Sequence, residues 1–276
     1  GTYYYKIVAL NQFGNQSSNC LKVDVRRSFL WSITYNDMDE WAYDMASDSE
    51  GNKYLIGTTQ NEFSAGARLV VLKFNSSGDF EWRRTHAESY YGRGYGLVID
   101  SNDNIYASGR GNNFKFSIIK YDTDGNVQWI RERGGLGSDD SLKEVALDSN
   151  EDVIAVGTTD GYGVGQEDII LMKYNKSGHF QWETTWGTPE KDYGFDAILD
   201  ENDNIYVSGH TNGAGAGGDD FLLIKFDSAG NQLWNTTWGT PDREGDRGFA
   251  PVRIAFDSNN NIYMVGRNNT ESSGGL

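Results

Sequence analysis

Short apolar runs separated by polar turns recur along the whole chain, and this pattern predicts β-strands. Within the segment 195–238 the alternation predicts four strands: Phe195–Leu199, Ile205–Ser208, Phe221–Ile224 and Gln232–Trp238. The turn at 200–204 is rich in Asp and Asn, which hydrogen-bond their own backbone and tolerate left-handed geometry. The third run is continuously apolar, as expected for a strand covered on both faces. We therefore predict a four-stranded antiparallel meander.

The same unit repeats at intervals of about fifty residues, which is the most informative feature of the chain. One landmark is a recurring tryptophan, found at Trp31, Trp82, Trp129, Trp182 and Trp234, and the last four of these follow a glycine turn. The other is a glycine that ends the second strand, found at Gly57, Gly109, Gly157, Gly209 and Gly266. Because both landmarks keep the same phase, we treat the units as structural repeats with boundaries near 31–82, 82–129, 129–182, 182–234 and 234–276.

A single four-stranded sheet cannot bury both of its faces, so neighbouring sheets must stack on one another. Radial stacking gives a β-propeller, in which each tryptophan would bury a large surface and hydrogen-bond the next sheet through its indole N–H. A linear β-solenoid is the alternative, although its rungs are usually shorter than fifty residues. We predict an all-β propeller over 28–276, an incomplete ring with about five blades visible, the fifth truncated.

The repeat pattern of Asp, polar turn, Ile-Tyr, Gly-Thr, Lys-Phe/Tyr and Asp-x-x-Gly-x-x-x-Trp resembles the SBBP-type propeller repeats of extracellular proteins. The motif Asp122-x-x-Gly125-x-x-x-Trp129 is also similar to the tryptophan-docking motif of quinoprotein propellers. The first resemblance implies a propeller in a secreted or cell-surface protein.

The first 27 residues do not follow the repeat. Tyr3, Tyr5, Ile7 and Ala9 alternate strictly with other residues before a turn at Gly14, and Leu21–Val25 predicts another strand. The segment 1–27 resembles the C-terminal strands of a fibronectin type III domain. We also expect an early outer strand at 29–35, which would close the ring against the last unit.

Composition narrows the classes of function. The chain has 276 residues, a net charge of −16 and a pI near 4.5, which argues against nucleic-acid binding, because such binders neutralise phosphates with clustered Lys and Arg. Cys20 is the single cysteine, so no intrachain disulfide or multi-thiolate zinc site is available. No apolar run approaches the roughly 20 residues of a membrane span, and we predict no insertion in this segment.

Acidic residues at the first strand of each unit are the leading candidates for ligand binding. They comprise Glu40, Asp140, Asp192 and Asp246 before each strand, and Asp44, Glu144 and Asp196 within it. If they face one rim or a central channel, they would favour a cationic or polyhydroxylated ligand, or a metal ion. Capped turns in a solvated channel are the simpler interpretation, and Arg253 at the equivalent position interrupts the pattern.

Trp186 and Trp238 precede Gly-Thr-Pro in two units, where they would either stack on sugar rings or extend the packing between blades. No catalytic constellation is visible, and we expect His86, His179 and His210 on the surface. We predict no metal site and no cofactor. The Asp-rich turns lack the glutamate of an EF-hand, which leaves weak calcium binding open.

Together these features predict a non-catalytic, extracellular or cell-surface binding or adhesion module that takes a protein or carbohydrate ligand. A quinoprotein-like or hydrolytic propeller enzyme is one alternative. A structural spacer in a large surface protein is the other.

Overall fold

The computed structural model describes residues 7–10, 39–61, 64–86, 92–134, 140–239 and 252–266. Within these ranges the chain consists of β-strands and turns, apart from one short 3-10 segment at Asn112–Phe114. The all-β class expected from the sequence is confirmed.

Four of the sheets have four antiparallel strands each, in chain order. The first contains β2 (Asp39–Ser47), β3 (Lys53–Asn61), β4 (Ser64–Phe74) and β5 (Phe80–His86). The second contains β6 (Arg93–Ile99), β7 (Ile105–Arg110), β8 (Lys115–Tyr121) and β9 (Val127–Gly134). The third contains β10 (Ser141–Leu147), β11 (Val153–Thr159), β12 (Asp168–Tyr174) and β13 (Phe180–Trp186). The fourth contains β14 (Asp192–Leu199), β15 (Ile205–Thr211), β16 (Asp220–Phe226) and β17 (Gln232–Trp238).

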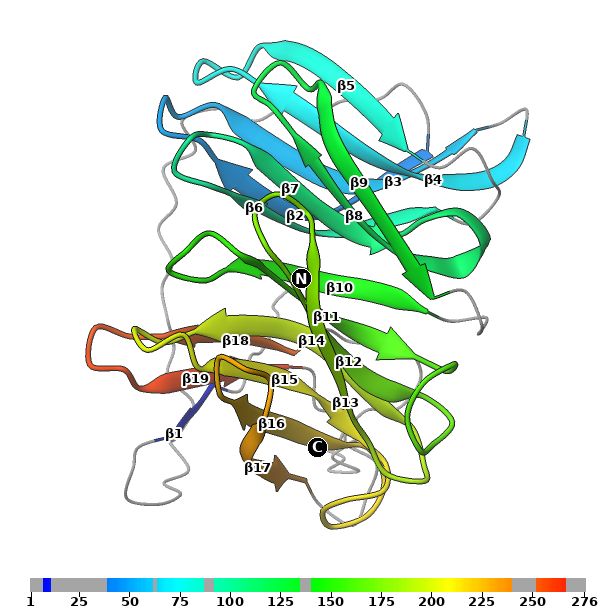
Figure 1. The fold of residues 1–276 in the computed structure, drawn as a ribbon, viewed down its shortest axis with the longest axis vertical. Coiled ribbons are helices and arrows are strands. Elements are labelled where there is room, and N and C mark those ends of the chain that lie inside the picture. The colour runs from blue at the N-terminus through cyan, green and yellow to red at the C-terminus, as the bar shows by residue number, and fades with distance from the viewer. Residues whose placement is uncertain are drawn as a thin grey trace, which may run out of the picture.

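The sheets follow one another in chain order, as Figure 1 shows, from β2–β5 at the top to β14–β17 at the bottom. The first strand of each sheet contacts the first strand of the next, so that β2 meets β6, β6 meets β10, β10 meets β14 and β14 meets β18. These first strands are the inner strands of propeller blades. The predicted β-propeller and the four strands of the 195–238 unit are therefore confirmed; the last strand has the predicted bounds, and the first three are longer than predicted.

The fifth sheet is assembled from both ends of the chain. It has the order β1–β19–β18, with β1 at Ile7–Leu10, β18 at Arg253–Phe256 and β19 at Ile262–Val265. Leu10 pairs with Ile262, just as Phe226 pairs with Ile205 in the fourth sheet, so β1 takes the register of a third strand. The predicted strands at 21–25 and 29–35 lie outside the described residues, and the fibronectin-like assignment of 1–27 stays a prediction.

The core lies between consecutive sheets, because the middle strands are buried on both faces. Every residue of β7, β11 and β15 is buried, whereas the outer strands β5, β9, β13 and β17 are largely half-buried or exposed. One apolar cluster fills each junction; Tyr106, Phe116 and Leu142, for example, join the second and third sheets. Radial stacking thus buries the faces that a single sheet would expose.

The repeated tryptophans connect each outer strand to the next sheet. The indole N–H of Trp82 donates to the carbonyl of Thr123 at 3.2 Å, and that of Trp129 donates to the carbonyl of Lys176 at 3.3 Å. A Cβ on Gly178 would lie 2.9 Å from the Trp129 ring, so the turn glycine gives the indole room to approach the backbone. The predicted docking role of the tryptophan is confirmed at these two junctions.

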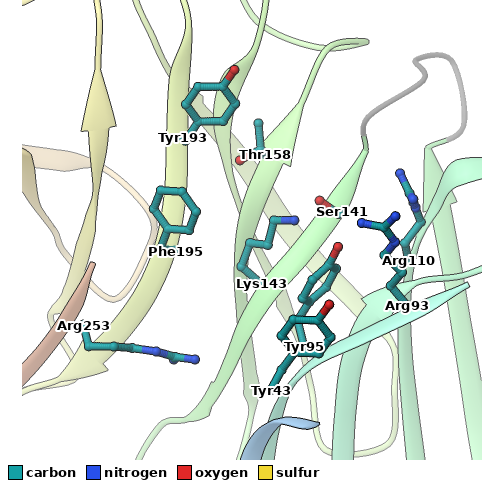
Figure 2. A pocket seen from close by; sticks show the side chains of 10 residues that line it. All are labelled: Tyr43, Arg93, Tyr95, Arg110, Ser141, Lys143, Thr158, Tyr193, Phe195 and Arg253. Atoms are coloured by element: carbon teal, nitrogen blue, oxygen red, sulfur yellow. The ribbon is translucent and has the colours of Figure 1, made fainter. Parts of the chain in front are cut away.

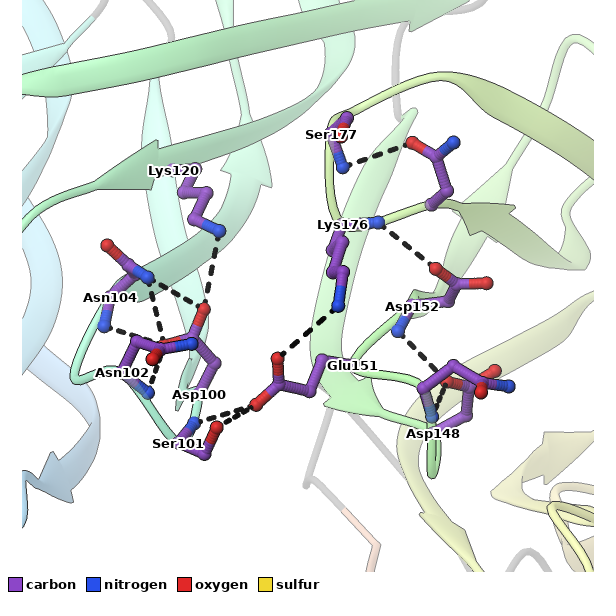
Figure 3. Close-up of polar contacts among 12 residues, drawn as sticks. Asp100, Ser101, Asn102, Asn104, Lys120, Asp148, Glu151, Asp152, Lys176 and Ser177 are labelled. Carbon is purple, nitrogen blue, oxygen red and sulfur yellow. Dashed lines mark hydrogen bonds and ion pairs between the residues drawn. The ribbon is translucent and has the colours of Figure 1, made fainter.

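The Asp-rich turns use their carboxylates to hold the chain, as Figure 3 shows for Asp100. Asp100 accepts the backbone N–H groups of Asn102 at 3.0 Å and Asn104 at 2.8 Å, and it also accepts from the Lys120 ammonium at 3.3 Å. Burial alone would raise the pKa of Asp100, but the hydrogen bonds from Asn104 and the charge of Lys120 lower it below its usual range. Calcium at this turn would have to displace these donors.

The same turns also join neighbouring sheets to one another. The backbone N–H of Ser101 donates to Glu151 of the next sheet at 3.0 Å, and its hydroxyl donates to the same carboxylate. Ser149 repeats the arrangement with Asp203, at 2.9 Å from its N–H and 2.7 Å from its hydroxyl. The turns therefore contribute to the rigidity of the assembly as well as to each hairpin.

Candidate functional site

A β-bulge interrupts each of the first four inner strands at the same place. The pairing register skips one residue on β2, β6, β10 and β14, and the skipped residues are Tyr43, Tyr95, Lys143 and Phe195. A bulge bends its strand and redirects the side chain of the extra residue, and bulges are common beside functional sites. All four redirected side chains line one pocket.

The repeat glycine makes the bulge sterically possible; in the first four sheets it lies within the second strand, which continues for one to four residues beyond the predicted end. A Cβ on Gly57 would lie 2.0 Å from the carbonyl oxygen of Trp41, and a Cβ on Gly209 would lie 2.0 Å from the carbonyl oxygen of Tyr193. The same clash recurs at Gly109 and Gly157. The repeat glycines found in the sequence therefore have a direct part in shaping the pocket.

The pocket has a volume of about 290 Å³ and lies where the inner strands converge. Figure 2 shows its side chains arriving from several strands: Arg93 and Tyr95 from β6, Ser141 and Lys143 from β10, and Tyr193 and Phe195 from β14. The strands β2, β7, β11 and β18 contribute one residue each, namely Tyr43, Arg110, Thr158 and Arg253. Five sheets thus take part in one site.

Four of the lining side chains are cationic, although the chain as a whole carries a net charge of −16. They are Arg93, Arg110, Lys143 and Arg253. The Arg110 side chain is buried, with the residue only 7% exposed, and its guanidinium lies 5.1 Å from the centre of the Phe114 ring. Partly desolvated guanidinium groups bind carboxylate, sulfate and phosphate groups well, because each offers several N–H donors in one plane. The pocket therefore has the charge of an anion site.

Lys143 and Tyr95 form a close pair inside the pocket. The Lys143 ammonium lies 3.9 Å from the centre of the Tyr95 ring. Burial would raise the pKa of Tyr95, but the charges of Lys143 and Arg93 outweigh burial and bring that pKa below its usual value. Burial also lowers the pKa of Lys143. Both groups are thereby brought toward the range in which side chains exchange protons with ligands.

Two hydroxyl residues lie between the cationic and the aromatic parts of the pocket. Ser141 on β10 and Thr158 on β11 are each 3% exposed, and their backbones pair directly with one another. Within the described part of the chain, the Thr158 Oγ1 has no hydrogen-bond partner. A buried hydroxyl without a partner is unfavourable, so this group is available to a ligand that carries a matching polar atom.

The acidic residues within the inner strands converge on Arg253. The Arg253 guanidinium forms an ion pair with Glu144 and lies 3.7 Å from the nearer Asp196 oxygen. Asp44 and Asp196 each also accept a backbone N–H from the next inner strand, from Leu97 at 2.9 Å and Ile254 at 2.8 Å. The cluster therefore joins neighbouring blades at the centre.

The crowding of these carboxylates has an electrostatic consequence. Burial and the nearby charges of Asp44 and Asp196 raise the pKa of Glu144 to about 8, against the opposing effect of Arg253. Burial likewise raises the pKa values of Asp44 and Asp196. The structure brings the three carboxylates together, and Arg253 offsets part of their charge.

The acidic residues that precede the inner strands are placed differently. Asp140 and Asp192 are fully buried: Asp140 accepts the Thr159 hydroxyl at 2.7 Å, and Asp192 accepts the backbone N–H of Thr188 at 2.6 Å. Neither lines the pocket. The Glu40 side chain and Asp246 lie outside what the structure describes. Ligand binding by this set stays a prediction.

The terminal tryptophans and the histidines were the remaining candidates. Trp186 and Trp238 are half-buried and pack against the apolar clusters of the third-to-fourth and fourth-to-fifth junctions. His179 is exposed as expected, but His210 is buried between Phe195 and Phe221, at ring distances of 5.5 Å and 5.1 Å. The surface expectation is wrong for His210, because the residue after the repeat glycine is buried in each of the first four sheets.

The sequence analysis overlooked two positions of the repeat: the residue after the repeat glycine and the residue at the bulge. Arg110 and Thr158 each follow a repeat glycine, and Lys143 immediately precedes an acidic residue that was singled out. Comparing these two positions across the repeats would have identified Phe195 and five more of the ten residues that line the pocket. Among the described residues, no three His, Cys, Asp or Glu side chains are grouped so as to hold a metal ion.

No protein-family model matches the chain, and no curated protein matches it. Among solved structures, the extracellular domain of BT3049 from B. thetaiotaomicron is similar over 88% of this chain and 30% of that one, with 12% identity and a TM-score of 0.49. The acylaminoacyl peptidase of Pyrococcus horikoshii is similar over 83% and 36%, with 10% identity and a TM-score of 0.48. The polysaccharide lyase Uly1 is similar over 83% and 57%, with 12% identity and a TM-score of 0.42. This chain therefore covers less than two thirds of each of those three.

Across the described ranges, no helix has the length and apolar character to cross a membrane.

Proposed function

We propose that this propeller is a non-catalytic binding module that takes up a small anionic ligand in the pocket between its inner strands. The observation that carries the proposal is the gathering of Arg93, Arg110 and Lys143 around one cavity in a strongly acidic chain. Cations placed together at a partly buried site repel one another and lose hydration, and a bound anion relieves both costs.

The charge outside the pocket limits the size of the ligand. A net charge of −16 repels extended polyanions, so nucleic acids and long acidic polymers are disfavoured before they reach the site. A cavity of about 290 Å³ also lies near the lower end of typical ligand pockets, which span roughly 300–1,000 Å³. Both features favour a compact ligand or the end of a short chain.

We further propose that the module acts outside the cell, on a protein or carbohydrate ligand. The resemblance of the repeats to those of extracellular propellers supports the location. The pocket supports the ligand class, since carbohydrates and peptide side chains commonly carry carboxylate groups. No cofactor enters this proposal.

The test is calorimetric titration of the whole chain with sodium acetate, sodium sulfate and sodium glucuronate at constant ionic strength. We expect saturable binding of at least one anion, lost in Lys143→Met and retained in Lys176→Met, whose lysine is exposed and lies outside the pocket. If none of the three anions binds, or if both variants weaken binding equally, the proposal is wrong.

An enzyme is the second candidate function, and the close pair of Tyr95 and Lys143 favours it. A phenol and an amine with shifted pKa values in one pocket are suited to transferring a proton to or from a bound ligand. Nuclear magnetic resonance of a bound ligand over several days would detect turnover. Conversion that disappears in Tyr95→Phe while binding persists would support an enzyme, and an unchanged ligand would support the binding module.

A further inference from the structure

Figure 2 shows two sides of the pocket, each of which has both a cation and aromatic rings, in different proportions. Arg93 and Arg110 lie on the β6–β7 side, and Tyr193 and Phe195 lie together on β14. The rings of Tyr193 and Phe195 have centres 6.4 Å apart and planes within 30° of each other, so they form one apolar wall with a phenol at its edge. A ligand that spans the pocket between these sides meets two guanidinium groups at one end and this wall at the other, while Tyr43 and Tyr95 lie near the arginines and Arg253 lies on the Phe195 side.

Hydrogen-bonding groups occupy the region between these two ends. Lys143, Ser141 and Thr158 lie there, and the Thr158 hydroxyl has no hydrogen-bond partner among the residues that the structure describes. Of all the lining side chains, Phe195 is the one without a hydrogen-bond donor. A ligand with no polar atom at this point would leave the Thr158 hydroxyl buried and without a partner among the described residues, which costs binding free energy. The middle of the pocket therefore calls for a ligand with several hydroxyl groups.

We propose that the ligand is an acidic saccharide: a single sugar residue, free or at the end of a short chain, that carries a carboxylate or sulfate group. The acidic group lies against Arg93 and Arg110, the ring hydroxyls meet Ser141 and Thr158, and an apolar face of the ring packs on Tyr193. A sugar ring offers both an apolar face and a set of hydroxyls, which matches the amphipathic wall. This inference rests on the anion-binding function proposed above.

The direct test compares ligands that differ in one feature at a time, by calorimetry on the whole chain at constant ionic strength. The probes are glucuronate and glucose 6-sulfate as acidic sugars, glucose as the neutral sugar, acetate and inorganic sulfate as anions without a ring, and benzoate as an aromatic carboxylate. We expect at least one acidic sugar to bind about 10-fold or more tightly than glucose, acetate, inorganic sulfate or benzoate. Whether glucuronate or glucose 6-sulfate binds more tightly shows whether the site prefers a carboxylate or a sulfate group.

The same measurements distinguish failure of the anion-site proposal from failure of the saccharide proposal. If no anion in the panel binds, the anion site itself is wrong. If acetate, sulfate or benzoate binds as tightly as the acidic sugars, the anion site stands and the saccharide is wrong. Equal binding of glucose and glucuronate would overturn the role of the arginines.

A matched pair of variants tests the hydroxyl contact. Thr158→Val keeps the shape of the side chain and removes the hydroxyl, and Thr58→Val makes the same change at the equivalent position of the first sheet. Thr58 is also 3% exposed, and its hydroxyl has no partner in the described ranges, but it does not line the pocket. We expect Thr158→Val to weaken the acidic sugar about 10-fold and to leave acetate and sulfate unchanged, and Thr58→Val to leave all of them unchanged. Equal effects of the two variants on the sugar would overturn the contact.

Discussion

Gly157 lies so close to the carbonyl oxygen of Ser141 that a Cβ on this glycine would come within 2.0 Å of it. The contact occurs beside the bulge on β10 that redirects Lys143 into the pocket. The repeat glycine and the pocket lysine are therefore parts of one local structure. A substitution at the glycine should affect stability and ligand binding together.

We expect Gly157→Ala to destabilise the protein by about 2 kcal/mol or more, because the obstructing atom is backbone and the strand must shift. Chemical denaturation measures the loss. Gly51→Ala is the control: Gly51 has a positive φ of 82°, but the nearest atom to its added Cβ is 3.6 Å away. That variant should lose only about 1 kcal/mol from backbone strain. Equal losses would show that the close approach at Gly157 has no effect of its own.

We expect the loss of a repeated tryptophan to reduce stability by different amounts at Trp129 and Trp234. Trp129 donates to Lys176 of the next sheet and packs in a core cluster, so Trp129→Ala should lower the free energy of unfolding by about 3–5 kcal/mol. Trp234 occupies the same position on β17 but is 40% exposed. Trp234→Ala should therefore lose less than half as much. Similar losses in the two variants would mean that docking on the next sheet is not the source of the stabilisation.

The acidic cluster predicts that stability falls as the pH rises. Burial beside Asp44 and Asp196 raises the pKa of Glu144 to about 8 in the folded protein, well above the value near 4.3 of an unfolded chain. Between those two values the folded state binds more protons than the unfolded state, so the free energy of unfolding decreases from about pH 5 to pH 8. The expected loss is on the order of a few kcal/mol.

Denaturation midpoints at half-unit pH steps measure this effect. Glu144→Gln removes the titrating group, so the slope between pH 5 and pH 8 should flatten, although Asp44 and Asp196 retain a part of it. Glu190→Gln, in an exposed loop, serves as the control and should keep the slope of the unmodified protein. An unchanged slope in Glu144→Gln would contradict the prediction.

An ion pair joins the outer strands of the second and third sheets, and we expect its coupling free energy to be measurable. The Arg133 guanidinium contacts both oxygens of Glu183, at 2.6 Å and 2.8 Å. A double-mutant cycle with Arg133→Met and Glu183→Gln should give a coupling of about 0.5–1 kcal/mol, since both groups are partly exposed. The single contact of Lys191 with Glu167, at 2.7 Å, should give a smaller coupling. A coupling of zero for Arg133 and Glu183 would show that hydration offsets the pair.

Local features of the fold were accessible to sequence reasoning because they depend on residues close together in the chain. Strand periodicity, turn glycines and the Asp-rich hairpins follow from the preferences of neighbouring residues. The repeat then implied the packing between sheets, because identical units must present identical faces. Asp44, Glu144 and Asp196 could be placed on inner strands for the same reason.

The pocket could not be read in this way, because its character comes from residues that differ between repeats. Arg93, Lys143 and Arg253 belong to three different sheets and share no local motif. Asp140 and Asp192 precede inner strands and were therefore candidates for ligand binding. In the structure, the hydroxyl groups of nearby Thr residues donate to their carboxylates.

The sequence by itself determined the repeating blade, since hydrogen bonds and turns within each unit specify it. The tertiary structure alone decided the charge and shape of the pocket. The bulges rotate Tyr43, Tyr95, Lys143 and Phe195 toward one another, and only the stacking of successive sheets places those four side chains around a single cavity.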